Sequence, residues 1–417
     1  MINAKVISIG DELLIGQVVN TNSSYINAKL YSNGFNPERV ITIGDNEKDL
    51  LAELDDSMKN FRITIITGGL GPTHDDITKP ILVKYFNDEL ILREDILEFV
   101  RNFFAKRNLP MPETNVGQAM VPSKSKVIWN HNGTAPGIWI ESDDRVFIAM
   151  PGVPFEMKAM IENDIIGMLK EKFASELDYV LKSKTILTTG IGESLLFEKI
   201  GDIESIIGKH KMAFLPSPLG VRLRIDVTGK SENEADGIIA GIEEKLRNKI
   251  GEFIFGVNDE LLEEAVGALL RKKGMTLATA ESCTGGLLSG RITDIAGSSD
   301  YYAGGVCAYS NEVKSGFLGV REKTLEEHGA VSEETAKEMA ERIRKKFGTS
   351  AGISVTGIAG PGGGTGSKPV GLTYIGYSDE NKCYALKFNF GDNRERNRIR
   401  AVQACLNLLR KELISSY

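Results

Sequence analysis

The stretch MTLATAESCTGGLL, at residues 275–288, places a buried strand directly before a helix. Its apolar-rich run at residues 275–280 is typical of a buried strand, and Leu287, Leu288 and Ile292 begin a helical pattern. Ser282 is therefore predicted to lie in the turn between them. Because the first N–H groups of a helix lack internal partners and the helix dipole is positive there, such a turn can hold a phosphate or a developing oxyanion.

The role of this turn has several readings. Gly285 and Gly286 would let a ligand approach the backbone closely. Alternatively, Ser282 or Thr284 only caps the helix. Cys283 is a competing nucleophile, because a thiolate beside a helix N-terminus is reactive, although small cysteines are commonly buried. A Ser-His-Asp triad is disfavoured, since none of the four histidines lies near the turn in sequence.

The residues around this turn continue the alternation of strands and helices. A helix is predicted at residues 261–270, and a long helix at about residues 393–413. Further strands are predicted at residues 304–309, 352–355, 371–377 and 384–390. The last third of the chain, residues 257–417, is therefore predicted to be an α/β domain.

The first part of the chain, residues 1–175, shows the same alternation. Strands are predicted at residues 5–9, 40–43, 63–66 and 146–149, and a helix at residues 155–172 closes the segment. This rhythm predicts a doubly wound, mostly parallel sheet with helices on both faces. Ligands of such sheets bind beyond the carboxyl ends of the strands.

The segment TGGLGPTHDDIT, at residues 67–78, follows one of these strands. Gly68, Gly69 and Gly71 would expose backbone N–H groups to phosphate oxygens. The carboxylates of Asp75 and Asp76 can hold a divalent cation that bridges those same oxygens. A glycine-rich turn followed by two carboxylates is a more specific indication of a phosphate and metal site than either feature alone.

Two other strand ends also carry acidic residues. Asp11 follows the first strand and Asp45 follows the second. One such aspartate is best explained as a helix cap. Three acidic turns at the same edge of a parallel sheet favour a ligand site instead.

The middle segment, residues 176–256, is smaller and differently built. A strand at residues 185–188 and a helix at residues 193–206 precede a strictly alternating strand at residues 221–227, and a helix follows at about residues 232–250. The order predicts a compact α+β domain whose sheet has one wet face. Arg222 and Arg224 are then most simply a solvated strand face.

Composition limits the class of protein. The 417 residues include 41% hydrophobic and 26% charged residues, with a formal charge of −7, which describes a soluble globular protein of two or three domains. The acidic balance argues against nucleic-acid binding. No apolar run approaches the roughly 20 residues of a membrane span, so we expect no membrane association and a cytoplasmic location. The four cysteines form no Cys-x-x-Cys pair, so neither a zinc site nor a disulfide framework is indicated.

The motifs together carry a resemblance to a known family. The segments GDELL at residues 10–14, TGGLGPTHDDIT at residues 67–78, GTAPG at residues 133–137 and PGVP at residues 151–154 resemble the molybdopterin-binding-like fold. The whole chain is similar to the CinA family of competence/damage-inducible proteins. The resemblance implies a homodimer whose partners are small nucleotides.

For the first domain, the resemblance implies a metal-dependent pyrophosphatase acting on ADP-ribose or related dinucleotides. The resemblance implies that Asp11, Asp45 and Asp76 bind the metal. The divalent ion would be Mg²⁺, Mn²⁺ or Co²⁺, and K⁺ would be an additional ion. Phosphate contacts fall on the three glycines of residues 68–71 and on Asp75. The sequence does not assign which carboxylate binds metal and which acts as base.

For the last domain, the resemblance implies a nicotinamide mononucleotide amidohydrolase without a cofactor. Ser282 would be the nucleophile and Lys314 its base, because a lysine whose pKa is lowered by burial can deprotonate a serine. Tyr309 would bridge or relay the proton. The remaining substrate contacts would come from five residues and one arginine of the last helix: Thr284, Gly285, Gly286, Thr356, Gly357 and Arg398.

These implications combine into a bifunctional enzyme of pyridine-nucleotide salvage. The alternative is a protein that binds a nucleotide or pterin without turnover and is linked to competence and DNA uptake. Lys314 and Tyr309 also have ordinary explanations without a catalytic role. A single lysine is most often a solvated surface side chain, and a single tyrosine most often packs in the core.

Overall fold

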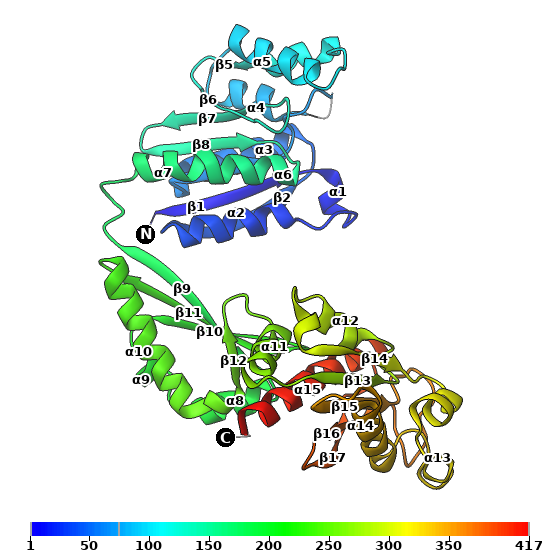
Figure 1. Cartoon of the computed structure of the whole chain (residues 1–417). Helices are drawn as coiled ribbons and strands as arrows, with labels where there is room; N and C mark the ends of the chain where they lie inside the picture. The colour runs from blue at the N-terminus through cyan, green and yellow to red at the C-terminus, as the bar shows by residue number, and fades with distance from the viewer. Residues whose placement is uncertain (1, 74–75, 416–417) are drawn as a thin grey trace. The chain divides into compact units, whose positions relative to one another are not determined.

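The structure is a computed structural model that describes residues 2–73 and 76–415 (Figure 1). The chain divides into two compact units. One comprises Met1–Lys182 with Val227–Asp236, and the other comprises Ser183–Asp226 with Gly237–Tyr417. Within the described ranges, no helix has both the length and the apolar character needed to cross a membrane.

A six-stranded sheet forms the centre of the N-terminal unit, in the order β2, β1, β3, β8, β7, β6. These strands are Asn36–Ile43 (β2), Asn3–Ile9 (β1), Ile63–Thr67 (β3), Arg145–Met150 (β8), Gly137–Ser142 (β7) and Lys126–Ile128 (β6). The first four are parallel to one another. At one edge, β7 pairs antiparallel with β8, and β6 pairs antiparallel with β7. The predicted doubly wound, mostly parallel sheet is confirmed.

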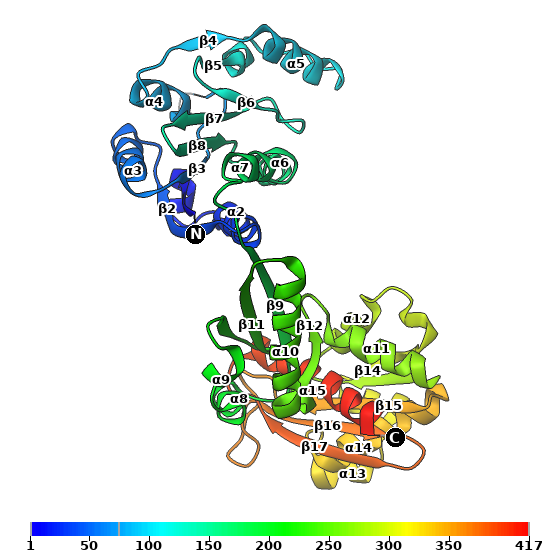
Figure 2. The same cartoon turned by 90° about the vertical axis from the view of Figure 1, so that its left-hand side faces the viewer.

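Helices cover both faces of this sheet (Figure 2). One face carries α2 (Thr21–Ser32), α6 (Pro154–Met160) and α7 (Ile166–Lys172), and the other carries α3 (Glu47–Asn60) and α4 (Thr78–Tyr85). Val6 packs with the first group and Ile7 with the second. Consecutive strand residues point to opposite faces, so one apolar run supplies two cores.

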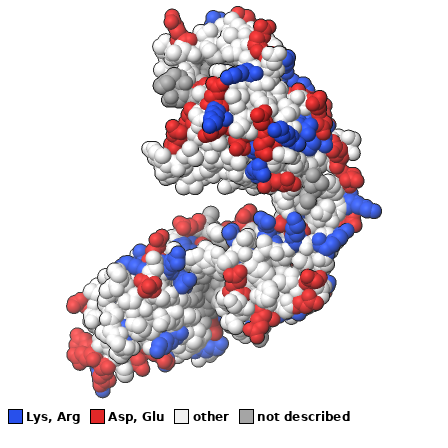
Figure 3. All heavy atoms as spheres, turned by 180° about the vertical axis from the view of Figure 1, so that it is seen from behind, with Lys and Arg blue, Asp and Glu red and all other residues white. Residues whose placement is uncertain are grey.

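Shorter elements complete this unit. They are α1 (Asp11–Leu14), β4 (Leu90–Leu92), α5 (Glu94–Ala105) and β5 (Met120–Pro122), and β4 pairs antiparallel with β5. In the space-filling view, Lys and Arg are interspersed with Asp and Glu over the visible face (Figure 3).

The middle segment contains a four-stranded sheet in the order β10, β11, β9, β12. Its elements are β9 (Val180–Thr188), α8 (Glu193–Ile200), α9 (Glu204–Ile207), β10 (Lys211–Ser217), β11 (Gly220–Gly229), α10 (Glu232–Ile250) and β12 (Ile254–Val257). Along β11, Val221 and Leu223 are buried whereas Arg222 and Arg224 are exposed, so the predicted wet face is confirmed.

One predicted helix of this segment is wrong in its length. The helix expected at residues 193–206 is two helices, because α8 ends at Ile200 and is capped by Gly201. This residue has φ of +72°, in the region that only glycine adopts readily. The apolar spacing alone did not show the break.

The C-terminal part has a five-stranded sheet in the order β14, β13, β15, β16, β17. Its elements are α11 (Leu262–Lys273), β13 (Leu277–Glu281), α12 (Leu287–Thr293), β14 (Tyr302–Cys307), α13 (Glu322–His328), α14 (Glu333–Phe347), β15 (Ala351–Gly357), β16 (Leu372–Ser378), β17 (Cys383–Asn389) and α15 (Arg394–Ser415). β14, β13 and β15 are parallel to one another. β16 pairs antiparallel with β15, and β17 pairs antiparallel with β16.

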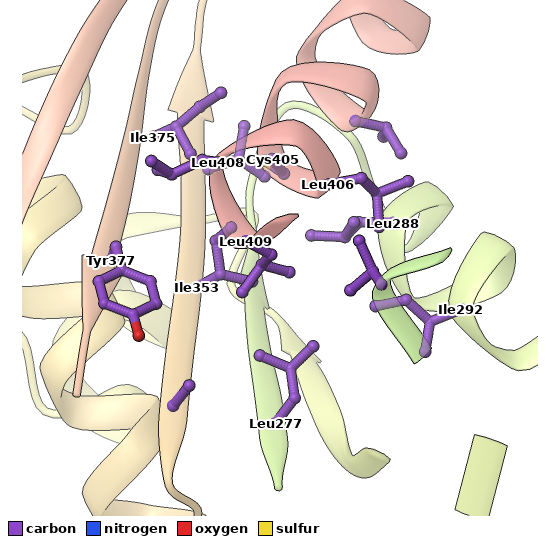
Figure 4. Packing of buried hydrophobic residues seen from close by; sticks show 14 of the residues in the cluster. Leu277, Leu288, Ile292, Ile353, Ile375, Tyr377, Cys405, Leu406, Leu408 and Leu409 are labelled. Carbon is purple, nitrogen blue, oxygen red and sulfur yellow. The ribbon is translucent and has the colours of Figure 1, made fainter. Parts of the chain in front are cut away.

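Two apolar cores hold this sheet between its helices. Leu277 and Ile353 pack with Leu406 and Leu409 of α15 on one face (Figure 4). Ala278 packs on the other face with Met339 of α14 and its neighbours. The loop after β13, which contains Ser282, is therefore anchored by a strand buried on both faces.

Candidate functional site

The turn after β13 is built from backbone hydrogen bonds and two glycines. The N–H of Ser282 donates to the carbonyl of Val355 on β15 (2.9 Å), and the N–H of Gly285 donates to the carbonyl of Ser282 (3.1 Å). Gly285 and Gly286 have φ of +60° and +92°, which side-chain-bearing residues rarely adopt. The predicted strand-to-helix turn at Ser282 is therefore present.

The carboxylate of Glu281 occupies the start of α12. It accepts from the N–H groups of Gly286 (3.0 Å), Leu288 (3.0 Å) and Ser289 (2.8 Å), and from the Ser289 hydroxyl (2.6 Å). The expectation that the first N–H groups of this helix are available to a ligand is therefore wrong for these three donors. Sequence reasoning assigned no role to Glu281, which directly follows the strand predicted at residues 275–280 and is the last residue of β13 in the structure.

Lys314 lies against the hydroxyl of Ser282. It belongs to a single π-helical turn, Val313–Leu318, and its side chain is buried. Its Nζ donates to Ser282 Oγ (3.1 Å) and to the carbonyls of Ala308 (2.9 Å) and Tyr309 (3.1 Å). Burial lowers the pKa of Lys314, because these neutral acceptors do not offset the cost of desolvating an ammonium.

Tyr309 meets Lys314 through its backbone. The carbonyl accepts the hydrogen bond, whereas the side chain is 61% exposed. Any residue at this position could supply that carbonyl, so the proton relay through the Tyr309 hydroxyl stays a prediction.

Cys283 is less suited to attack than Ser282. It is buried, and desolvation raises the pKa of its thiol to about 11. The thiolate is the nucleophilic form. At neutral pH this residue is therefore held as the thiol.

Arg398 connects α15 to the same turn. Its Nη2 donates to the carbonyl of Thr284 (2.7 Å). The Thr284 hydroxyl and Arg398 Nε are buried and have no hydrogen-bond partner among the described residues. Of the arginines that open α15, Arg394 and Arg400 instead contact the carbonyls of Gly360 and Phe390. The structure therefore brings Arg398 and Thr284 together.

Thr356 and Gly357 lie at the end of β15, which pairs with β13, the strand directly before Ser282. The Thr356 hydroxyl donates to the carbonyl of Ala330 (2.6 Å). A Cβ at Gly357 would lie 2.7 Å from the Thr373 hydroxyl, so glycine allows the close approach of β16. In this structure both residues pack locally, and their substrate contacts stay a prediction.

In the N-terminal unit, a cavity of about 480 Å³ opens at the carboxyl ends of β1, β3 and β8. Gly68, Gly69, Gly71, Asp45 and Asp76 all line it. A Cβ at Gly68 would lie 2.4 Å from the carbonyl of Ile9, and one at Gly69 would lie 2.4 Å from the Thr78 hydroxyl. Glycine is therefore required for this loop to pass so close to its neighbours.

The predicted carboxylates are arranged in two groups. The Asp11 N–H donates to Asp45 Oδ2 (3.0 Å), and the Asp45 N–H donates to Asp11 Oδ1 (3.3 Å). Asp76 accepts from the N–H groups of Gly71 (2.7 Å) and Thr73 (2.8 Å), which closes the glycine loop. Asp75 lies outside the described residues. Within residues 2–73 and 76–415, no group of three or more acidic, His or Cys side chains is placed to hold a metal.

Sequence reasoning missed two carboxylates of this cavity, those of Glu12 and Glu156. Glu12 lies against Gly10, and Glu156 accepts from Asn130 Nδ2 (2.6 Å) at the first turn of α6. Glu12 lies within one motif that the sequence had already marked, residues 10–14, and Glu156 follows another, residues 151–154. The available signal was their position, with Glu12 two residues after Gly10 and Glu156 two residues after Pro154.

Three family descriptions match successive parts of the chain. "Probable molybdopterin binding domain" matches residues 5–171, "Damage-inducible protein CinA KH domain" matches residues 183–256, and "CinA C-terminal domain" matches residues 259–413. The fold and sites thus define a multidomain α/β protein with a molybdopterin-binding-like N-terminal domain and a KH-like middle domain.

Full-length relatives agree with this class. A CinA-like protein of Cytophaga hutchinsonii is 42% identical over 99% of this chain and 98% of its own length. A CinA-like protein of Flavobacterium psychrophilum is 41% identical over 99% of both chains. The crystal structure of the competence/damage inducible protein CihA from Agrobacterium tumefaciens is 38% identical over 37% of this chain and 94% of that one, with a TM-score of 0.36. The chain belongs to the CinA family.

Proposed function

We propose that the C-terminal domain hydrolyses the carboxamide of nicotinamide mononucleotide, giving nicotinic acid mononucleotide and ammonia. The observation that carries the proposal is the 3.1 Å contact between Lys314 Nζ and Ser282 Oγ. A buried lysine with neutral partners, in contact with a serine hydroxyl, is the arrangement that activates serine without histidine.

The chemistry follows from this pair. Lys314, as the neutral amine, takes the proton of Ser282 while Oγ bonds to the carboxamide carbon. The resulting ammonium returns the proton to the amide nitrogen, ammonia leaves, and an ester to Ser282 remains. Water activated by Lys314 then cleaves the ester and releases the acid.

The oxyanion formed in each step needs donors. The N–H groups of Cys283 and Thr284 lie beside Ser282, and neither donates to another residue's backbone within the part of the chain that the structure describes. They are our candidates, in place of the α12 donors that Glu281 occupies. Arg398 lies at the same turn and would meet the phosphate of the nucleotide.

The test is product release by the full chain. Ammonia and nicotinic acid mononucleotide should appear in equal amounts, and Ser282→Ala should abolish both. A control variant, Ser315→Ala, changes a serine of the π-helical turn that carries Lys314. Among the described residues, the Ser315 hydroxyl bonds only to the Asn311 carbonyl. Full turnover by Ser282→Ala would exclude this mechanism.

For the N-terminal domain we propose hydrolysis of the diphosphate in ADP-ribose or related dinucleotides. The support is the shared cavity, in which a glycine loop and the carboxylates of Asp45 and Asp76 face one space. Mg²⁺ is commonly held by one or two carboxylates together with substrate phosphates, so these two residues fit a cation shared with the substrate. Such a cation would neutralise the diphosphate and lower the pKa of the attacking water.

Chelation tests this second activity. ADP-ribose cleavage by the full chain should stop with exhaustive chelation and return with Mg²⁺, Mn²⁺ or Co²⁺. Asp45→Asn should impair cleavage while leaving amide hydrolysis unchanged. Binding of ADP-ribose without cleavage under every metal condition would instead favour a nucleotide-binding domain without turnover.

A further inference from the structure

The middle segment and the C-terminal part enclose a cavity of about 520 Å³. Every residue that lines it belongs to one compact unit of the chain. These residues come from the loop after β9, the turn between β10 and β11, the strand β17 and the helix α15. None of them belongs to either candidate site described above, and the volume is in the range of small-molecule sites.

One wall of this cavity is a single face of α15. The residues that the helix contributes follow one another at spacings of three and four or are adjacent, which places them on one side of a helix: residues 400, 403, 404, 407, 408 and 411. Two of them, Arg400 and Lys411, are cations, and no Asp or Glu of the described residues lines the cavity. In a chain with a formal charge of −7, a cavity without carboxylates favours an anionic ligand.

Asn407 on this face has a buried amide with one unused end. Its side chain is 9% exposed, and its Oδ1 accepts from Arg410 Nε (3.3 Å) and Nη2 (3.2 Å). Arg410 is itself buried and donates through Nη1 to the carbonyl of Ile254 (3.0 Å), so the amide oxygen is held in place. The NH₂ group of Asn407 has no acceptor within residues 2–73 and 76–415. A buried donor without an acceptor costs free energy, which a bound anion would recover.

The loop after β9 lies against this amide. A Cβ at Gly190 would lie 2.4 Å from Asn407 Nδ2, so glycine leaves room for the NH₂ group. Gly190, Ile191 and Gly192 line the same cavity, and none of their N–H groups donates to another residue's backbone in the described part of the chain. Successive backbone N–H groups of this kind form a concavity that binds anions.

The strand β17 supplies an aromatic wall. Leu386, Phe388 and Phe390 alternate along the strand and line the cavity from one face of it. The rings of Phe388 and Phe390 are stacked, with centroids 5.4 Å apart. Leu219, in the turn between β10 and β11, also lines the cavity and is 44% exposed. Apolar and aromatic walls beside a few fixed polar groups are typical of sites for ligands with a planar ring.

We propose that this cavity binds a small molecule in which a planar aromatic ring carries a phosphate or a carboxylate. The anionic group would accept from the Asn407 NH₂ group, from Arg400 and from the N–H groups of residues 190–192. The ring would pack against Phe388 and Leu219. Arg400 Nη1 donates to the Phe390 carbonyl (2.8 Å), which places the guanidinium beside the aromatic wall. The proposal depends on neither of the two proposed activities, because no residue of their sites takes part.

Calorimetry on the full chain tests the two parts of the ligand separately. The probes are 1-naphthyl phosphate and 1-naphthoate, with 1-naphthol as the ring without the anionic group and inorganic phosphate as the anion without the ring. At least one naphthyl anion should bind, and the tighter of the two identifies the anionic group. Naphthol and inorganic phosphate should each bind at least about tenfold more weakly, because each lacks either the charge-assisted hydrogen bonds or the apolar contact.

Asn407→Asp is the decisive variant. It keeps the oxygen that faces Arg410 and replaces the NH₂ group with a second carboxylate oxygen, so the bound anion would meet a like charge. Affinity for the naphthyl anion should fall by at least about tenfold. The melting temperature should not fall, because the new carboxylate pairs with Arg410. Arg400→Gln should also weaken binding by about tenfold, the usual effect of losing a charge-assisted hydrogen bond.

Asn381→Asp is the matched control. It makes the same change of charge at an exposed residue of the same unit that does not line the cavity. This variant should bind the naphthyl anions as the unmodified chain does.

Each outcome either supports or overturns the site. No binding of either naphthyl anion, equal affinity for naphthol or inorganic phosphate, or unchanged affinity in Asn407→Asp would overturn it. Displacement of the naphthyl anion by a single-stranded oligonucleotide would assign the cavity to nucleic acid and refute the small-molecule ligand. Lost binding in Asn407→Asp, with ammonia release and ADP-ribose cleavage unchanged from those of the unmodified chain, would support a site separate from the two catalytic ones.

Discussion

Lys314 Nζ lies 3.1 Å from Ser282 Oγ, although 32 residues separate them in the chain. The π-helical turn Val313–Leu318 brings the lysine to the end of β13, and both side chains are buried. Its other acceptors among the described residues are two backbone carbonyls, so none of the described carboxylates contacts the ammonium directly. The neutral amine is therefore favoured relative to an exposed lysine.

The first prediction concerns the protonation of this lysine. Burial lowers the pKa of Lys314, so the fraction of neutral amine rises with pH and reaches its plateau below the range of an exposed lysine. Amide hydrolysis should rise with pH in the same way. Lys314→Arg should lose activity by about 10²- to 10⁴-fold, because the guanidinium stays protonated. Rates of ammonia release measured across pH check this, and an active Lys314→Arg enzyme would contradict it.

The second prediction separates serine from cysteine as nucleophile. Ser282→Ala should reduce turnover by at least about 10³-fold, the usual effect of removing a nucleophile. Cys283→Ala should retain most of the activity, because its thiol has a pKa raised to about 11 and remains protonated. Mass spectrometry after substrate trapping should find the acyl group on Ser282. An acyl group on Cys283 would reverse the assignment.

The third prediction concerns Glu281 as a positioning residue. Glu281→Gln replaces an acceptor of four hydrogen bonds with an amide that must place its NH₂ against N–H donors. The variant should lose about 2–4 kcal/mol of stability, the cost of disturbing charge-assisted hydrogen bonds. It should also lower kcat more than it raises KM, since the turn holding Ser282 shifts.

Glu338→Gln is the control for that variant. Glu338 is buried to a similar degree on α14, where it pairs with Arg321 and Thr324. It should destabilise the protein without changing kcat. Equal kcat values for the Glu281 and Glu338 variants would show that Glu281 acts on stability alone.

The fold could be predicted because its signals are local. The apolar run at residues 5–9 supplies two cores by alternation, and Gly10 and Gly68 mark where strands end. The break at Gly201 was missed because a φ of +72° is set by the packing of the chain and not by apolar spacing. The antiparallel strands β16 and β17 were expected as strands, but their direction depends on connections that periodicity does not encode.

The residues of the two candidate sites likewise differ in whether their positions could be predicted from local sequence. Ser282 and the glycines of residues 68–71 lie in turns, and turn chemistry is readable from sequence. The approach of Lys314 and Arg398 to the Ser282 turn is long-range and was inferred only through family resemblance. Glu281 carried no sequence signal, since a strand-end carboxylate is ordinary until its partners are known.

The last prediction concerns Lys79, a buried lysine of α4 beside the glycine loop. Its Nζ donates to the carbonyls of Gly117 and Gln118, and burial lowers its pKa to about 8. Below that pH the lysine is charged in both the folded and the unfolded chain, so the cost of burying the charge is fully present. Above the unfolded pKa of about 10.4 it is neutral in both states and the cost is absent. The free energy of unfolding should therefore rise between pH 8 and about 10.4, by up to about 3 kcal/mol from this group.

Tryptophan fluorescence isolates the N-terminal unit, because the two tryptophans of the chain, Trp129 and Trp139, both belong to it. Urea unfolding followed by this signal should give a stability that increases with pH over that interval. Lys79→Met retains the apolar stem and removes the titrating group, so its stability should be less dependent on pH. Lys84→Met, at an exposed position of the same helix, should keep the slope of the unmodified chain. A slope that survives Lys79→Met must arise from other groups and would refute the buried charge of Lys79 as the cause.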